Sequence, residues 1–433
     1  MNADTLHYIR EHAGDDVRQL ALRSVPANVD LRVALTQIEG RQLAARKLPT
    51  WAAADGLLFP PRLSLEQCSS EATAAYKRRV VSTLNSQHSS DIHKVSPYNL
   101  STFLDLTAGF GVDFAAIAPL FSQAVYVEQQ AVLCDLARHN LPLLGLPQAE
   151  VRCTTAEEVL RELSLEPSSA SARVVMIDPA RRDMAGRKVA LIEDCTPDVC
   201  ALQEQLRTVA AVTLIKLSPM LDLTAALRSL RGIREAHAVS VDGECKELLL
   251  VMAGRPSPDT SCDGGEGPRT EDVPIYCVDL SAASPASVSS GPSSFRFTRA
   301  EEAAAPLLLA DAVGEFLYEP NASLLKAGAY KIVCQRFPVR KLATNTHLYT
   351  SDRLLSDFPS RRWRVVDSAS FSKQDLRRLL RDIPAADLTV RGFPTSVATL
   401  RKQLRLHEGG AAHFIATTLS DGSRRLIRVE NER

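Results

Sequence analysis

The middle of the chain combines short apolar runs with longer segments in which apolar residues recur every three or four positions. The first pattern predicts buried strands and the second predicts amphipathic helices. We interpret five runs as strands, at residues 103–104, 124–127, 151–153, 173–177 and 213–217. Because helical segments separate them, the pattern predicts an α/β fold. A doubly wound, Rossmann-like sheet of this kind binds its ligand at the carboxyl ends of the strands.

The turn after the first strand is rich in glycine. The strand ends at Asp105, and the pattern Asp-x-Thr-Ala-Gly-x-Gly places Gly109 and Gly111 before a helix that begins near Asp113. Glycine lets the backbone approach a ligand where a Cβ would clash, and the free N–H groups of a helix start favour a carboxylate or a phosphate. The turn is predicted to be a ligand loop, although it departs from the Gly-x-Gly-x-x-Gly form. Asp113 either caps the helix or contacts the ligand.

Charged residues lie at or just after the ends of three of the other strands. Glu128 ends the second strand at about 20 residues past the glycine loop, the spacing at which a Rossmann fold presents a carboxylate to ribose hydroxyls. The segment 178–182, Asp-Pro-Ala-Arg-Arg, follows the fourth strand, and Lys216 lies near the end of the fifth. Since the carboxyl ends of parallel strands meet at one edge of a sheet, these residues are expected on the same rim as the loop.

The Asp-x-Thr-Ala-Gly-x-Gly loop, Glu128 and the Asp-Pro-Ala-Arg-Arg segment resemble class I S-adenosylmethionine (SAM) methyltransferases. The likeness is to bacterial enzymes of that class that carry a C-terminal THUMP-like domain. These in turn resemble, more distantly, the RNA guanine-N2 methyltransferases of the cap-hypermethylating type. Outside the core, the resemblance extends to segments 65–71, 318–322, 345–349 and 391–394, so that it covers most of the chain from the region of Asp30 onward.

The resemblance implies SAM as the cofactor and assigns its main contacts. Asp105 would hold the SAM amino group, directly or through water, unless it is a helix-capping aspartate. Glu128 would bind the ribose diol. Thr107 stands where the commoner Gly-x-Gly-x-Gly form has its first glycine, so that Thr107, Gly109 and Gly111 would form the cofactor loop.

Further cofactor contacts are implied by the resemblance alone. Ala156 follows the third strand, where the class presents groups to the adenine. Ser70 and Glu71 open a helix, and related enzymes have a Ser/Thr-x-Glu helix start near the methionine end of SAM. The alternative is that this helix start is structural and that Ser69, immediately before them, simply caps it, because a serine before an acid suits an N-cap.

The resemblance also gives Asp178 and Pro179 a catalytic role. Amino-methylating members of the class use Asp/Asn-Pro-Pro followed by an aromatic residue. A side-chain oxygen and a backbone carbonyl there accept hydrogen bonds from an amine, and the aromatic ring stacks on a flipped base. Here the aromatic residue is absent, so Arg181 or Arg182 would stack on a base or bind a phosphate, unless both are solvated loop residues. Lys216 would bind substrate phosphate or is an edge lysine.

Composition narrows the remaining choices. The 433 residues include 51 Lys+Arg and 51 Asp+Glu, so the formal net charge is zero and any basic surface for a nucleic acid must be local. Nine scattered cysteines without a Cys-x-x-Cys fit a reducing compartment better than a zinc site, and no metal is expected. No apolar run reaches the ~18 residues of a membrane span, and the N-terminus lacks a signal peptide's apolar core. We expect a cytoplasmic protein without a membrane partner.

The length corresponds to roughly two to four domains. We expect an N-terminal helical domain at 1–95, the methyltransferase core at 96–255, a small α+β, ferredoxin-like module at 273–350 and a THUMP-like domain at 351–433. The THUMP-like module implies contact with RNA. A phosphate-binding face in this module would consist of Arg378, Arg391, Arg401, Lys402 and Arg405. The alternative is that these are ordinary solvated side chains.

The leading hypothesis is a SAM-dependent methyltransferase that acts on RNA at a guanine or another base amine. An alternative keeps SAM but makes the acceptor a protein or a small molecule, which the neutral charge and the missing aromatic residue favour. A nicotinamide oxidoreductase is disfavoured because its glycine pattern is absent. Outside the enzymes, the alternative is a non-catalytic RNA-binding adaptor that retains the fold.

Overall fold

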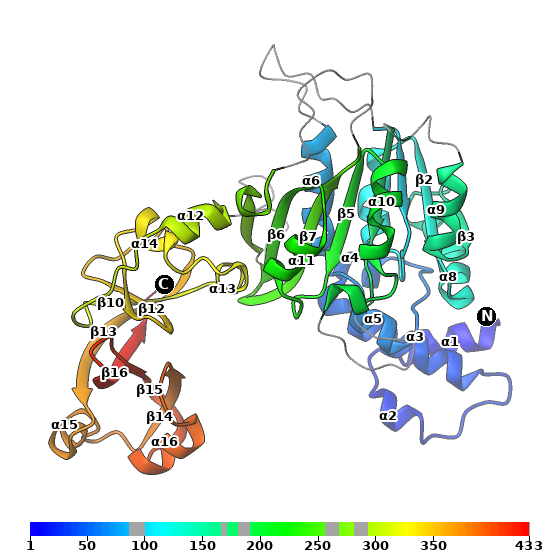
Figure 1. The fold of residues 1–433 in the computed structure, drawn as a ribbon. Helices are drawn as coiled ribbons and strands as arrows, with labels where there is room; N and C mark the ends of the chain where they lie inside the picture. Colours follow the sequence, from blue (N-terminus) through cyan, green and yellow to red (C-terminus); the bar gives the residue numbers. More distant parts are fainter. Residues whose placement is uncertain are drawn as a thin grey trace. The chain divides into compact units, whose positions relative to one another are not determined.

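The computed structural model describes residues 1–85, 100–165, 170, 172–180, 191–255, 268–280 and 293–432. Figure 1 shows the fold and labels its elements where there is room. The described chain forms two compact units. The first holds Met1–Ala236 and the strand segment that begins at Glu247. The second holds the turn His237–Lys246, the segment Glu271–Asp279 and the described residues from 293 onward.

The described N-terminal residues are helical, which agrees with the sequence-based prediction. The helices are α1 (Ala3–Glu11), α2 (Val17–Leu20), α3 (Leu31–Lys47), α4 (Pro49–Ala53), α5 (Arg62–Gln67) and α6 (Glu71–Asn85). Apolar side chains from α3 to α6 form a core that includes Trp51 and Phe59. Phe110 of the glycine loop belongs to the same core, with its ring centroid 5.0 Å from that of Trp51 and 6.1 Å from that of Phe59. The helices therefore support the loop directly.

Parallel strands in the order β3-β2-β1-β4-β5 form the centre of the first unit. They are β1 (Thr102–Asp105), β2 (Gln123–Glu128), β3 (Glu150–Cys153), β4 (Arg173–Ile177) and β5 (Val212–Leu217), and they confirm the five predicted strands. Strand β4 is buried along its whole length, as expected for a central parallel strand covered on both faces. Strand β7 (Glu244–Ala253) pairs antiparallel with β5, and β6 (Ile233–Val241) lies next in the order.

The crossover helices are α7 (Val112–Ile117), α8 (Ala131–Leu143), α9 (Ala156–Ser164), α10 (Val199–Val209) and α11 (Leu223–Ser229). Side-chain oxygens of Thr155, Asp198 and Asp222 accept backbone N–H groups at the starts of α9, α10 and α11, which satisfies donors that the first turn leaves open. In Figure 1, α10 and α11 cover the face of the sheet that is turned toward the viewer. This doubly wound arrangement confirms the Rossmann-like fold class.

In the second unit, β8 (Ile275–Leu280) pairs antiparallel with β9 (Ser293–Phe297). The hydroxyl of Ser240, near the β6–β7 turn, donates to Asp279 Oδ1 at 2.7 Å, and its oxygen lies 3.1 Å from the Val278 carbonyl oxygen. Helix α12 (Arg299–Ala304) follows.

The rest of this unit is built on one seven-stranded sheet, in the order β11-β12-β10-β13-β16-β15-β14. Its strands are β10 (Phe316–Pro320), β11 (Arg340–Ala343), β12 (Thr346–Ser351), β13 (Ser360–Ser370), β14 (Ala385–Arg391), β15 (His407–Thr418) and β16 (Arg424–Asn431). Its helices are α13 (Ala322–Ala327), α14 (Ile332–Arg336), α15 (Lys373–Leu379) and α16 (Val397–Leu404).

The predicted ferredoxin-like and THUMP-like modules share this sheet. Strands β10 and β13 pair antiparallel, with Leu317 opposite Trp363. The two side chains belong to one apolar core together with Leu348 and Ile427. The boundary between the two modules, predicted at residue 350, therefore runs through a common sheet rather than through a linker.

Candidate active site

The glycine loop connects β1 to α7. Asp105 ends β1 and is almost fully buried, and its Oδ1 accepts the Thr107 backbone N–H at 3.2 Å. Gly109 and Gly111 have φ values of +57° and +88°, the left-handed region that glycine enters without strain. A Cβ on Gly111 would also lie 3.4 Å from Cε2 of Tyr126. The local chain thus requires glycine, which is why the sequence pattern was informative.

Glu128 at the end of β2 lies against this loop. Its Oε2 accepts the Gly109 backbone N–H at 3.0 Å, and its Oε1 accepts the Gln130 N–H at 2.9 Å. The hydroxyl of Tyr126 donates to the Gly109 carbonyl. The structure therefore brings the two predicted carboxylates, Asp105 and Glu128, to the same short loop.

Asp105 has an unusual electrostatic environment. Burial raises the pKa of its carboxyl well above the usual range, and the nearby Asp113 carboxylate adds to the increase. The Thr107 N–H and, more weakly, Lys216 oppose this increase without cancelling it. A cationic ligand bound next to Asp105 would favour the ionised form of its carboxyl, because an opposite charge within a few ångström stabilises the charged form.

Asp178 follows β4 and is joined to the loop from the other side. Its backbone N–H donates to the Thr107 hydroxyl oxygen at 2.6 Å. Its Oδ2 accepts from Lys216 Nζ at 2.5 Å, whereas its Oδ1 has no hydrogen-bond partner within the part of the chain that the structure describes. Pro179 is buried and Ala180 is exposed. The backbone of Ala180 forms an antiparallel bridge with Thr196, with bonds of 2.7 and 3.0 Å.

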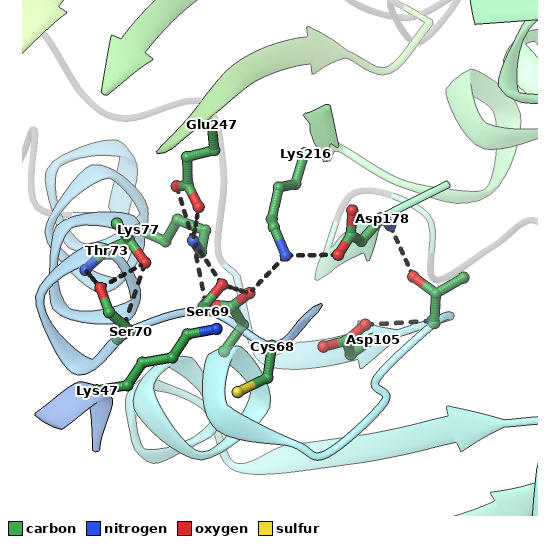
Figure 2. Close-up of polar contacts among 12 residues, drawn as sticks. Lys47, Cys68, Ser69, Ser70, Thr73, Lys77, Asp105, Asp178, Lys216 and Glu247 are labelled. Carbon is green, nitrogen blue, oxygen red and sulfur yellow. Dashed lines mark hydrogen bonds and ion pairs between the residues drawn. The ribbon is translucent and has the colours of Figure 1, made fainter. Parts of the chain in front are cut away.

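A buried set of charges lies beside Asp178, on the side of Lys216 (Figure 2). Lys216 Nζ lies 3.7 Å from Asp113 Oδ2, and Asp113 Oδ1 lies 3.1 Å from Lys77 Nζ. Lys77 is completely buried and donates to both carboxylate oxygens of Glu247 at 2.7 Å. Burial raises the pKa of Asp113, but Lys77 and Lys216 outweigh it and leave that pKa lowered.

Two assignments around this network are corrected by the structure. Asp113 does not cap α7, because Gly111 occupies the N-cap position; its carboxylate pairs with the two lysines. Ser69 was expected to cap α6, but its hydroxyl donates to Asp113 Oδ2 at 2.6 Å. The backbone N–H of Thr73 instead donates to Ser70 Oγ at 3.2 Å, so Ser70 is the residue that caps the helix.

The other residues predicted to contact the cofactor, Glu71 and Ala156, lie at the starts of helices α6 and α9. Glu71 Oε1 accepts the backbone N–H groups of Thr50 and Trp51 at 2.8 and 3.3 Å, at the start of α4. Ala156 is the first residue of α9 and is buried. Cofactor contacts for Ser70, Glu71 and Ala156 remain predictions. Arg181 and Arg182 lie outside the described residues.

Lys77 and Glu247 were not among the residues predicted from the sequence. Lys77 lies on α6 between the buried residues Ala74 and Val81, at the three- and four-residue spacing of an apolar helical face. A lysine on such a face is rarely fully buried without a partner. That position was therefore a sign of a buried ion pair, although it did not identify Glu247, which is 170 residues away.

The predicted phosphate-binding face of the C-terminal module is largely occupied by internal contacts. Arg378 pairs with Asp367, and Arg391 pairs with Glu319. Arg401 donates to the carbonyls of Ala386 and His407 at 2.8 and 2.7 Å. Three of the five basic residues thus have partners within the second unit, although the side chains of Arg378 and Arg391 stay 52% and 43% exposed.

The sheet order, the glycine loop and the carboxylates at the ends of β1 and β2 define a class I methyltransferase. Two family models match the second unit: a ferredoxin-like domain at residues 316–359 and a THUMP domain-like model at residues 360–431. Within the described residues, no group of three or more His, Cys, Asp or Glu is arranged to hold a metal ion. None of the helices described has both the length and the apolarity to cross a bilayer.

Two relatives extend the likeness over the chain. A crystal structure of a putative methyltransferase from Porphyromonas gingivalis has 32% sequence identity and a TM-score of 0.79, and the match covers 99% of this chain and 97% of that one. An uncharacterized S-adenosylmethionine-dependent methyltransferase of Mycobacterium tuberculosis is 26% identical over 326 residues, which are 74% of this chain and 78% of that protein. The chain belongs to the family of class I SAM-dependent methyltransferases with a C-terminal THUMP-like domain.

Proposed function

We propose that this SAM-dependent methyltransferase acts on RNA and methylates a base amine of the guanine-N2 type. The observation that carries the proposal is the position of Asp178. Its backbone N–H is bound by Thr107 of the glycine loop, while one carboxylate oxygen has no partner among the described residues. A hydrogen-bond acceptor thus lies directly beside the loop that would hold the cofactor.

The residues around the loop fit SAM by their chemistry. The cofactor offers an ammonium group and a ribose diol, which are hydrogen-bond donors, and the loop presents two buried carboxylates, Asp105 and Glu128. Gly109 and Gly111 have positive φ values and add no side chain, so the backbone of the loop can approach a ligand closely. Asp105 would take the amino group and Glu128 the ribose hydroxyls. When bound, SAM supplies a methyl group on a positively charged sulfur, which is already a strong electrophile.

The chain then has to hold the acceptor in line with that methyl group. Asp178 Oδ1 would accept a hydrogen bond from the acceptor N–H and direct the nitrogen lone pair toward the methyl carbon. Orientation of this kind supplies much of the acceleration in a two-reactant step. An amine that gains the methyl group has to lose a proton, and Asp178 or water would accept it. Pro179 would fix the turn that carries the carboxylate.

A protein or small-molecule acceptor is the second candidate. It is favoured by the zero net charge and by the internal pairing of Arg378, Arg391 and Arg401, because an RNA-binding face needs available cations. A non-catalytic adaptor would lack transfer to any acceptor.

Nucleoside mass spectrometry of RNA from a deletion strain tests the proposal. We expect one methylated nucleoside to disappear and to return with the wild-type gene but not with Asp178→Ala. The same RNA should accept labelled methyl groups from SAM with the purified protein in vitro. Unchanged nucleosides together with labelling of a protein or small-molecule fraction would favour the second candidate. Asp178→Ala should keep SAM binding, and full turnover by that variant would exclude the role given to Asp178.

A further inference from the structure

Lys216 lies on β5 beside the residue proposed to hold the acceptor. Its Nζ is 2.5 Å from Asp178 Oδ2 and 3.7 Å from Asp113 Oδ2. The Lys216 side chain is 12% exposed, whereas that of Asp178 is 34% exposed. The ammonium group is therefore held inward between two carboxylates, and Asp178 is the more open member of the pair.

Five charged side chains form a connected series of alternating sign. The series runs from Glu247 through Lys77, Asp113 and Lys216 to Asp178. These residues come from α6, α7, the end of β4, β5 and β7, and Figure 2 shows Lys216 between the buried group and Asp178. Every internal member has a neighbour of opposite charge on both sides. A movement of Lys216 would leave the half-exposed Asp178 without its cation and the buried Asp113 with Lys77 as its one remaining cation among the described residues, which is unfavourable.

Lys216 is poorly suited to bind a substrate phosphate. Burial lowers its pKa, but the carboxylates of Asp178, Asp113 and Glu247 outweigh that effect, so its pKa is raised and the side chain stays charged. A phosphate would have to draw the ammonium group away from two carboxylates that already neutralise it. Asp105, at the end of β1, is a further acid near Lys216. The Asp178 carboxylate raises the pKa of Asp105, and Lys216 lowers it.

We propose that Lys216 is a positioning residue that fixes the Asp178 carboxylate through Oδ2 and leaves Oδ1 directed at the acceptor amine. With one oxygen held by a charge-assisted hydrogen bond, the other is restricted to a small range of directions. The inference rests on the proposed function for the reaction that Asp178 serves. The ion pair and its coupling to the buried series are independent of that function.

Steady-state kinetics separate positioning from phosphate binding. For Lys216→Met we expect kcat to fall roughly 100-fold, the scale of a small displacement of a reacting group. KM for the acceptor and the Kd for SAM should stay within about two-fold of wild type. Lys216→Arg should recover part of kcat because it keeps the charge. Lys246→Met removes an exposed lysine that is paired with Glu244 and serves as the matched control, with unchanged kinetics.

The opposite pattern would overturn the inference. A phosphate contact predicts that Lys216→Met raises KM with kcat unchanged, and that the slope of log affinity against log salt falls by about one. A double-mutant cycle of Lys216→Met and Asp178→Asn, measured as unfolding midpoints without any substrate, tests whether the two side chains interact. This test does not require the wild type to transfer a methyl group. We expect the two losses to be clearly less than additive. Additive losses would refute the pairing, whereas a lack of wild-type transfer would refute only the proposed function.

Discussion

Replacement of Asp105 by asparagine distinguishes a cofactor-binding carboxylate from a structural one. Asparagine keeps the size of the side chain and an oxygen that can accept the Thr107 N–H, which is 3.2 Å away. The substitution therefore removes the negative charge and preserves the local hydrogen bond. A residue whose only task is to hold the loop should tolerate this change.

The raised pKa of Asp105 gives the sign of the stability effect. Burial and Asp113 raise this pKa in the folded protein well above its usual range, whereas the pKa in the unfolded chain is about 3.9. At pH values between the two, the native state holds a proton on Asp105 that the unfolded state has lost. Stability contributed by this group consequently falls as pH rises through that window. Without SAM, Asp105→Asn should therefore unfold at a higher temperature than wild type at pH 8, with a smaller difference near pH 4.

SAM binding should change in the opposite direction. Loss of a hydrogen bond to a charged group removes about 1.5–3 kcal/mol, which corresponds to a roughly 10- to 150-fold higher Kd for SAM. Wild-type affinity for SAM should also weaken as pH falls through the raised pKa of Asp105, because the protonated carboxyl no longer attracts the ammonium group. Calorimetric titration at several pH values measures both effects, and Glu150→Gln, at an exposed acid of β3, is the control. Unchanged affinity in Asp105→Asn together with a lower unfolding temperature would refute the reasoning.

Three further substitutions test the support of the loop. Phe110→Ala should cost about 3–5 kcal/mol of stability and weaken SAM binding, because the ring packs against the helical domain. Denaturant unfolding measures the loss of stability and calorimetric titration measures the Kd for SAM. An unaltered Kd would contradict the supporting role of Phe110. Thr107→Val leaves the Asp178 N–H without its acceptor, at a cost of about 1–3 kcal/mol, and should lower kcat more than SAM affinity, whereas Thr107→Ser should retain activity. Lys77→Met should lower the free energy of unfolding by roughly 3–5 kcal/mol, because it leaves Glu247 as a buried charge without Lys77. Adding Glu247→Leu to this variant should recover stability in denaturant unfolding. A double variant less stable than Lys77→Met alone would exclude the buried pair.

Local patterns predicted the centre of the candidate site. The end of β1 at Asp105, the left-handed glycines and the acid after β2 are properties of a few neighbouring residues, and the Rossmann-like sheet then brings the ends of β1, β2 and β4 together. For this reason Asp105, Gly109, Glu128 and Asp178 could be placed near one another from the sequence.

Long-range side-chain pairing was not predictable in the same way. Glu71 fits a helix-start motif, yet its carboxylate binds Thr50 and Trp51 of an earlier helix. The Lys77–Glu247 pair joins elements 170 residues apart. Periodicity shows which face of an element is buried, but it does not specify which charged residue meets another inside the fold.

A crystal structure of the chain with S-adenosylhomocysteine tests the central claim most directly. We expect the ribose hydroxyls within hydrogen-bond distance of Glu128, the amino group at Asp105, and the sulfur on the side of the ligand where Asp178 Oδ1 lies. Density for the ligand elsewhere, or none at saturating concentration, would contradict it.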